Sequence, residues 1–342
     1  MPKILFTDMT IGNTYKTTVL LTGITQKTTK TGKTFLELSL SDGHAKITGK
    51  LWDSSRDSFL HEPNSLIDVS IYPKDYNGST DYIINEVSVC IDHSLHIEDF
   101  IIKIPYDVNT LYNNIIKMIK SSVDPRFAPE ADGEHSISEI TVNILERYRD
   151  QYTVWAAAKS VHHAIYGGLV YHSFRMCTSA YMLSRVYRIA DREMLVCGAA
   201  LHDIGKIIEL HSELGIASYT PAGRMLGHAY IGMRMIEDEL KDTPCNEERA
   251  QVLLHLLASH HGLGEYGAIS YPATLEAELL HNIDVIDAHS YIYETELREV
   301  EPGEVSDKRI FALDNNTIYR PSYLTDDILS ILDDPELYNP KG

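Results

Sequence analysis

The stretch Ala200-Leu-His-Asp-Ile-Gly-Lys206 places a histidine and an aspartate side by side, with a lysine in the next helical turn. Imidazole nitrogen and carboxylate oxygen together suit a divalent ion such as manganese, iron, cobalt or zinc, and a carboxylate can bridge a second ion. On a helix, Lys206 shares a face with His202 and Asp203, from which its ammonium group can reach a phosphate oxygen. The stretch therefore predicts a helical metal site for phosphate chemistry, although a lone His-Asp pair is more often structural.

Other segments carry the same arrangement, in which a metal-binding residue type lies on or beside an apolar stripe with helical spacing. These residues are His172, His228, His260 with its neighbour His261, and Asp284 with Asp287 one turn later. Ligands from successive helices can converge inside a bundle core, so the set predicts one shared site. Helical phase leaves His260 and His261 as rival ligands. It leaves Asp284 and Asp287 as rivals in the same way.

In their order along the chain, these residues resemble the ligand set of the HD superfamily of metal-dependent phosphohydrolases, specifically of members able to hold two ions. The likeness extends to bacterial 3′-to-5′ exoribonucleases of the YhaM type, which join an OB-fold to an HD domain. It is carried by His162-His-Ala-Ile-Tyr-Gly-Gly-Leu-Val-Tyr-His172, by 219–228, by Ser259-His-His-Gly262 and by the tail Phe311-Ala-Leu-Asp-Asn-Asn-Thr-Ile-Tyr-Arg-Pro321. The resemblance covers nearly the whole chain and is most specific in its HD half.

The resemblance implies removal of nucleoside monophosphates from the 3′ end of RNA, with single-stranded DNA as a further substrate. It implies a divalent cofactor, one or two ions, with manganese as the first choice and iron, cobalt, zinc and magnesium as alternatives. The implied ligands of one ion are His172, His202, Asp203 and Asp284, and those of the second are His228, His260 and the shared Asp203. The HD pattern favours Asp284 over Asp287.

Asp203 and Lys206 are the predicted catalytic residues, because Asp203 would bridge the ions and Lys206 would neutralise charge that develops on the phosphate. Arg224, in the loop before His228, is predicted to hold the neighbouring phosphate, and His163 to line the substrate path. Structural alternatives exist for these roles, since Lys206 can simply neutralise Asp203 and Arg224 can be a solvated loop residue.

The N-terminal segment is predicted to be a β-barrel. Short strand patterns cover 14–22, 34–40, 45–52, 67–72 and 82–89. Breaks near Gly32, Asp42-Gly43 and Asn77-Gly78 are hairpin signals, and five such strands are the inventory of an OB-fold.

Barrels of this kind bind single strands by stacking bases on aromatic side chains. The candidates for stacking are Phe35, Trp52, Tyr76 and Tyr82, and the candidates for phosphate contacts are Lys27, Lys30 and Lys33 in one Thr- and Gly-rich loop. A barrel core also needs aromatic residues, and lysines at a hairpin tip are usually solvated, so each candidate has a structural alternative.

The predicted fold class is a multidomain α+β chain, with an N-terminal OB-fold barrel followed by an all-α HD-domain bundle. We predict an OB-fold single-strand-binding domain over 1–95, a helical connector over 96–160, the HD domain over 161–295 and a C-terminal extension over 296–342.

The net charge of −19 opposes a polyanionic substrate over most of the surface. Residues 1–95 hold nine basic and eleven acidic residues, a net charge of −2, which leaves −17 for the rest of the chain. The four cysteines are far apart and are predicted to be free thiols of a cytoplasmic protein. No apolar run approaches the roughly 20 residues that cross a bilayer, so no membrane partner is predicted.

Two other functions fit parts of the pattern. The HD half alone also fits a phosphohydrolase of nucleotides or of cyclic and signalling nucleotides, and an acidic surface suits such small substrates. The barrel alone fits a single-strand-binding factor in replication or regulation, with the HD half as a non-catalytic scaffold. The sequence leaves the oligomeric state open, a homo-oligomer included.

Overall fold

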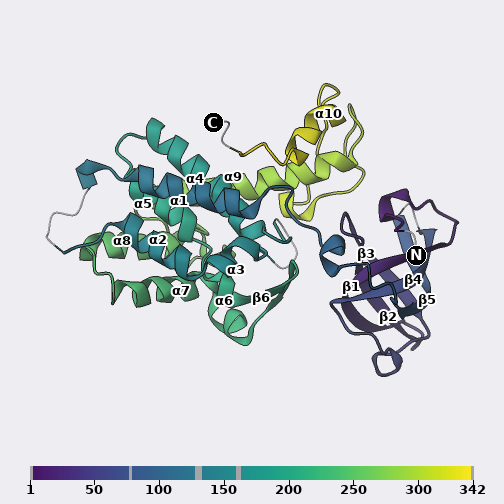
Figure 1. Cartoon of the computed structure of the whole chain (residues 1–342). Helices are drawn as coiled ribbons and strands as arrows, with labels where there is room; N and C mark the ends of the chain where they lie inside the picture. Colours follow the sequence, from purple (N-terminus) through teal and green to yellow (C-terminus); the bar gives the residue numbers. More distant parts are fainter. Residues whose placement is uncertain (1–2, 77–78, 128–132, 159–162, 340–342) are drawn as a thin grey trace. The chain divides into compact units, whose positions relative to one another are not determined.

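A computed structural model of the chain describes residues 3–76, 79–127, 133–158 and 163–339. The chain forms two compact units, Met1–Lys103 and Ile104–Gly342 (Figure 1). The first is a closed β-barrel and the second a helical bundle, which confirms the predicted fold class. The predicted turn at Asn77-Gly78 and the His162 of the quoted motif lie outside the described residues.

The barrel has the strand order of an OB-fold. Its strands are β1 (Tyr15–Thr28), β2 (Thr34–Ser41), β3 (Lys46–Trp52), β4 (Ser65–Tyr76) and β5 (Ser79–Val89). They close in the order β1-β2-β3-β5-β4, with β3 and β5 parallel and the other neighbours antiparallel. The long β1 pairs with both β2 and β4, and its register with β2 shifts between Leu21 and Gly23. Such a bulge bends a strand, which lets β1 close the barrel.

Side chains alternate between the inside and the outside of the barrel, as the period of a strand requires. Along β2, Leu36, Leu38 and Leu40 are fully buried in the barrel core. On β3, Gly49 faces Ile84, and a Cβ at position 49 would lie 2.5 Å from the Ile84 Cδ1 atom. The core is therefore filled by aliphatic side chains, and the residues between them on β2 face outward.

The second unit packs its helices around one hydrophobic core (Figure 1). They are α1 (Val108–Ser122), α2 (Ile137–Arg147), α3 (Arg149–Val154), α4 (Gly168–Val186), α5 (Arg192–Leu201), α6 (Lys206–Glu209), α7 (Pro221–Leu240), α8 (Glu247–Ser259) and α9 (Leu275–Glu296). The segment predicted as a connector thus contributes α1, α2 and α3 to the same unit as the HD helices. Within the described ranges, no helix has both the length and the apolar composition of a membrane span.

Several helices begin at a residue that caps their free N–H groups. Asp107, Asp191, Thr220 and Thr274 each accept a hydrogen bond from a backbone N–H in the first turn of the helix that follows. Ser136 forms a reciprocal capping box with Glu139 at the start of α2. These short polar side chains stabilise helix starts and explain where the bundle helices begin.

A hairpin and a C-terminal segment complete the unit. The hairpin joins β6 (Leu210–Glu213) to β7 (Ile216–Tyr219) directly after α6. The C-terminal segment includes the short α10 (Asp326–Leu329) and surrounds the buried guanidinium of Arg320. That guanidinium donates to the carbonyl oxygen atoms of Val300 and Leu324 and pairs with Asp326. Its hydrogen bonds hold the segment after α9 together.

Candidate metal centre

The His202-Asp203 pair lies where α5 ends and α6 begins, and a close approach of α7 brings His228 beside it. Gly205 permits this approach, because a Cβ at that position would lie 2.0 Å from the carbonyl oxygen of His228. Directly before His228, α7 bends at Gly227, whose φ of 71° lies in the region that favours glycine. The two glycines therefore position a ligand from α7 against the end of α5.

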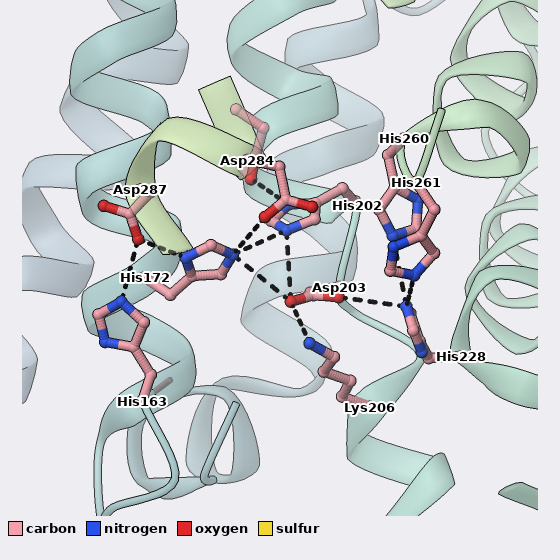
Figure 2. Close-up of polar contacts among 12 residues, drawn as sticks. His163, His172, His202, Asp203, Lys206, His228, His260, His261, Asp284 and Asp287 are labelled. Carbon is pink, nitrogen blue, oxygen red and sulfur yellow. Dashed lines mark hydrogen bonds and ion pairs between the residues drawn. The ribbon is translucent and has the colours of Figure 1, made fainter. Parts of the chain in front are cut away.

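Two groups of nitrogen and oxygen donors converge at this point (Figure 2). One consists of His172, His202 and Asp284, the other of His228, His260 and His261, and the donor atoms of each group lie within 4.8 Å of one another. Asp203 lies between the groups. Its Oδ2 atom is 3.3 Å from Nε2 of His202, and its Oδ1 atom is 3.4 Å from Nε2 of His228. A carboxylate so placed has the geometry that a bridging ligand needs.

In four of these histidines, the Nδ1 atom faces an oxygen that can only accept a hydrogen bond. The acceptors are the Asp287 carboxylate for His172 at 2.7 Å, the Ala199 carbonyl for His202 at 2.9 Å, the Glu209 carboxylate for His228 at 3.1 Å and the Leu257 carbonyl for His260 at 2.7 Å. Each Nδ1 therefore carries the hydrogen, and each Nε2 is directed into the centre as a potential ligand.

The Nε2 atoms lie very close together. Nε2 of His172 is 3.1 Å from Nε2 of His202, and Nε2 of His228 is 3.3 Å from Nε2 of His260. Two lone pairs at this distance repel unless a proton or a cation lies between them. A donor set of imidazoles and carboxylates therefore fits a divalent metal, and its high nitrogen content suits manganese, iron, cobalt or zinc better than calcium.

The ionised carboxylates of the centre also favour a cation. Nζ of Lys206 is 2.6 Å from Oδ2 of Asp203. Burial acts to raise the pKa of Asp203, but Lys206 and other cationic neighbours hold that pKa well below its usual value. Burial alone would lower the pKa of His172, whereas the carboxylates of Asp284 and Asp287 raise it to about 10. A cation bound at Nε2 of His172 must displace a proton, so metal affinity is expected to fall with falling pH.

A cavity of 360 Å³ adjoins both donor groups. Its polar lining consists of Asp203, Lys206, Glu209, His228, His261, Asp284 and His289, and its apolar lining of Ala157, Ala158, Leu210, Tyr219, Val285 and Ala288. Arg224, predicted to hold a phosphate, is exposed and lies over the Tyr219 ring, with Cζ 5.8 Å from the ring centroid. A ligand in this cavity meets candidate metal ligands, an ammonium group and an apolar surface.

Comparisons with known proteins identify the family. An HD-domain model matches residues 169–289, which contain every candidate ligand. The 3′-5′ exoribonuclease YhaM of Bacillus subtilis (strain 168) is 30% identical over 307 residues, 89% of this chain and 94% of that protein. Its namesake from Geobacillus sp. (strain WCH70) is 31% identical over 92% of this chain and 94% of its own. The chain belongs to the YhaM family of 3′-5′ exoribonucleases.

A solved structure also matches the N-terminal part of this YhaM-family chain. It is the second OB-fold domain of replication protein A from Methanococcus maripaludis, with 18% identity, a TM-score of 0.22, and coverage of 27% of this chain and 98% of that one. The barrel itself has the five strands, the closure and the strand order of an OB-fold, independently of that match.

The rival carboxylates Asp284 and Asp287 lie on opposite sides of one imidazole (Figure 2). Oδ1 of Asp284 is 3.4 Å from Nε2 of His172, on the side of the centre. Oδ2 of Asp287 is 2.7 Å from Nδ1 of the same ring. Asp287 also accepts a hydrogen bond from Arg175, which pairs in turn with Glu294. In this YhaM-family chain, Asp284 thus faces the candidate centre, and Asp287 holds the candidate ligand His172 from the other side.

His163, which was predicted to line the substrate path, is not among the residues that line the cavity. It is completely buried, its Nε2 atom is 3.0 Å from Oδ2 of Asp287, and its ring packs on Tyr291. Burial lowers the pKa of His163 to about 3, so the ring is neutral and can donate one hydrogen bond to the carboxylate. The His163 side chain therefore supports Asp287.

Three residues of the centre were not found by sequence reasoning. Glu209 receives hydrogen bonds from both the backbone N–H and the ring of His228, and Arg175 and Glu294 extend the network behind His172. For Glu209 and Arg175 a signal did exist, because each lies in a mostly apolar segment, where an unpaired charge would be costly to bury.

The aromatic candidates of the barrel fall into different environments. Phe35 and Trp52 are cross-strand partners on β2 and β3, with ring centroids 4.7 Å apart. Phe35 is only 8% exposed, but Trp52 is 41% exposed. Tyr76 is exposed at the end of β4, whereas Tyr82 packs against the barrel core. The outward Phe35–Trp52 pair is therefore the best formed stacking surface among the candidates, and Tyr82 is largely structural.

The lysine candidates are partly neutralised by acidic neighbours. Lys27 pairs with Glu37 at 2.7 Å, and Lys33 lies 4.0 Å from Asp53. Lys30 is exposed at the tip of the same loop. The loop thus offers a weaker attraction to phosphates than its three lysines alone predict.

Proposed function

We propose that this chain is a divalent-metal-dependent 3′-5′ exoribonuclease that hydrolyses the terminal phosphodiester bond of single-stranded RNA and releases nucleoside monophosphates. The observation that carries the proposal is the pair of donor groups joined by Asp203 beside a cavity that contains Lys206. The family relationship supports RNA as the substrate, with single-stranded DNA as a further one. We propose manganese as the metal.

In this proposal, His172, His202, Asp203 and Asp284 hold one ion, and His228, His260 and Asp203 hold the other. His261 is an additional donor, because its Nε2 atom is 3.0 Å from that of His228 and burial lowers its pKa to about 4, which keeps the ring neutral. When bound, such ions lower the pKa of water and stabilise charge on phosphate oxygens. Lys206 is held in place by Asp203 and adds a fixed positive charge beside the scissile phosphate.

The apolar part of the cavity lining is proposed to receive the terminal nucleoside, because it includes Tyr219, Val285 and Ala288 and an aromatic ring can stack on a base. The substitution Tyr219→Ala is therefore expected to raise KM for RNA about tenfold, since stacking on one aromatic ring contributes about 1–3 kcal/mol. Tyr219→Phe is the matched control and should retain the wild-type KM. Steady-state kinetics on one labelled RNA would check both variants, and an unchanged KM in Tyr219→Ala would contradict this role.

The barrel is proposed to bind single-stranded RNA through the outward Phe35–Trp52 pair. The substitution Trp52→Ala is expected to weaken binding of a single-stranded RNA by about 10- to 100-fold, because stacking of a base on this ring is lost. Trp52→Phe should retain most of the affinity. Fluorescence anisotropy in the presence of chelator would measure binding without hydrolysis, and equal affinities of Trp52→Ala and the wild type would exclude the pair as the platform.

The proposed function is tested with 5′-labelled single-stranded RNA and DNA of the same sequence, each incubated with manganese, magnesium, zinc or chelator. Products resolved to single nucleotides should shorten from the 3′ end only when metal is present. Intact oligomers together with hydrolysis of a mononucleotide would favour a small-nucleotide phosphohydrolase, which the net charge of −19 suits. Binding without turnover in every lane would favour a single-strand-binding factor.

The cytoplasm is the proposed compartment, since the four cysteines of the chain are free thiols.

A further inference from the structure

A second cavity, of 680 Å³, lies in the helical unit and is lined mainly by arginine side chains. Its lining consists of Asp124, Arg126, Ser184, Arg185, Arg188 and Arg192. They come from the chain just after α1, from the end of α4 and from the start of α5. Four guanidinium groups and one carboxylate therefore share a single cavity, in a chain whose net charge is −19.

Two of the four arginines are held in fixed orientations. The Arg126 guanidinium donates to Asp124 through Nε and Nη2, and its Nη1 atom donates to the carbonyl oxygen of Arg188 at 3.0 Å. Nε of Arg192 donates to the carbonyl oxygen of Ser122 at 3.1 Å. These bonds occupy only part of each guanidinium, which has five N–H donors.

The positive charge of the cavity is not balanced within the described part of the chain. Among the ion pairs of the described residues, Arg126 is the only one of the four arginines that pairs with a carboxylate, that of Asp124. Arg185 and Arg188 are exposed at the end of α4. Because arginine does not release its proton at physiological pH, the charges that Asp124 does not neutralise repel one another unless a further anion joins them.

The dipole of α4 accounts for only part of the cluster. A cation in the last turn of a helix is favourable, and this explains Arg185. Arg192 occupies the first turn of α5, where the same dipole makes a cation unfavourable. The carboxylates closest to it in sequence, Asp191 and Glu193, both pair with Arg249 instead. Helix electrostatics therefore does not explain why these arginines gather.

We propose that this arginine cavity binds an anion that carries two or more adjacent phosphate groups. Guanidinium groups bind phosphate oxygens through paired, charge-assisted hydrogen bonds, and four of them exceed what one phosphate needs. The same chemistry is offered by a nucleoside polyphosphate and by the backbone of an RNA strand.

The site is separate from the metal centre. Ser184 of the cavity and His172 of the centre lie twelve residues apart on α4, which separates them by about 18 Å along the helix axis. An RNA whose 3′ end occupies the metal centre would need about five nucleotides to span that length at a stacked rise of about 3.4 Å. A dinucleotide substrate cannot reach the cavity. If the bound anion is the backbone of an RNA strand, the inference rests on the proposed exoribonuclease function. If it is a free nucleoside polyphosphate, the inference does not depend on that function.

The test compares the full-length, manganese-loaded wild type with the double variant Arg185→Ala/Arg188→Ala. The matched control is Arg234→Ala/Lys241→Ala, which removes the same charge from exposed positions on α7 and at its C-cap. One arm measures binding of inorganic pyrophosphate by calorimetry. The other measures KM for a dinucleotide and for a twelve-nucleotide RNA. Thermal unfolding of both variants checks that they are folded.

An affinity for pyrophosphate at least tenfold weaker in the double variant than in the control supports the proposal. With unchanged KM values, that result identifies a free polyphosphate as the ligand. A tenfold higher KM for the twelve-nucleotide RNA alone also supports the proposal and identifies the RNA backbone. Equal behaviour of the double variant and the control in both arms overturns it. If no protein hydrolyses RNA, the proposed function fails, and the pyrophosphate arm still decides on the cavity.

Discussion

The substitution Asp203→Asn is expected to lower RNA hydrolysis at least about a thousandfold and to remove most of the bound metal. Asp203 faces both donor groups, with Oδ2 3.3 Å from His202 and Oδ1 3.4 Å from His228. Asparagine has nearly the same shape, but it is neutral and offers one oxygen instead of two. The variant therefore removes the bridging charge without leaving a cavity.

Metal content and hydrolysis are to be measured on the same preparation of Asp203→Asn. The control is Asp238→Asn, which makes the same chemical change in an exposed ion pair with Lys241. Circular dichroism should show native helical content in both variants, and single-stranded RNA binding should be unchanged because the barrel is untouched. Full turnover in Asp203→Asn would show that hydrolysis occurs elsewhere.

The candidate ligands could be picked out from the sequence because each one interrupts an apolar helical face, as His172 does on α4 and His260 at the end of α8. Their order along the chain then points to a single family. The five strands of the barrel were predictable for a similar reason, since strand periodicity and turn residues are local features. Features that depend only on neighbouring residues, such as helix faces, strand periodicity and turns, could therefore be predicted from the sequence.

Helical phase alone did not decide between Asp284 and Asp287, and only the resemblance to the HD pattern favoured Asp284. The two carboxylates lie one turn apart on α9, and the ring of His172 presents Nε2 to one and Nδ1 to the other. Helical phase predicts the face of α9 on which a residue lies. It does not predict which nitrogen of a partner imidazole that residue contacts. His163 is a second example. It belongs to the same sequence motif as His172, but its Nε2 atom contacts Asp287 and is not directed into the centre.

The charged residues that surround the candidate lysines and form the arginine cavity could not be predicted from the sequence either, because their positions depend on strand register and on contacts between distant segments. Lys27 is neutralised by Glu37 of the neighbouring strand, and this pairing follows from the register of β1 with β2. The arginine cavity joins Arg126 to the arginines of 185–192, which lie about sixty positions later in the chain. No local pattern marks such a cluster.

The substitution Asp287→Ala is expected to destabilise the protein by about 3–5 kcal/mol, because it leaves a partly buried guanidinium and two buried imidazoles without their shared acceptor. Asp287 is 5% exposed and receives hydrogen bonds from His163, His172 and Arg175. It should also lower metal affinity by about 10- to 100-fold, because the ring of His172 loses the partner that fixes its orientation and tautomer.

The contrasting variant Asp284→Ala should lose metal affinity with a smaller loss of stability, since Asp284 faces the centre and contacts His172 from the other side. Asp287→Asn should partly restore stability, because its amide oxygen can still accept a hydrogen bond from His172. Urea denaturation in chelator and metal titration monitored by calorimetry would separate the two effects. Equal stability and equal metal affinity in Asp287→Ala and the wild type would contradict a supporting role. A loss of both properties that is the same in Asp284→Ala and Asp287→Ala would instead mean that the two carboxylates act as one ligand set.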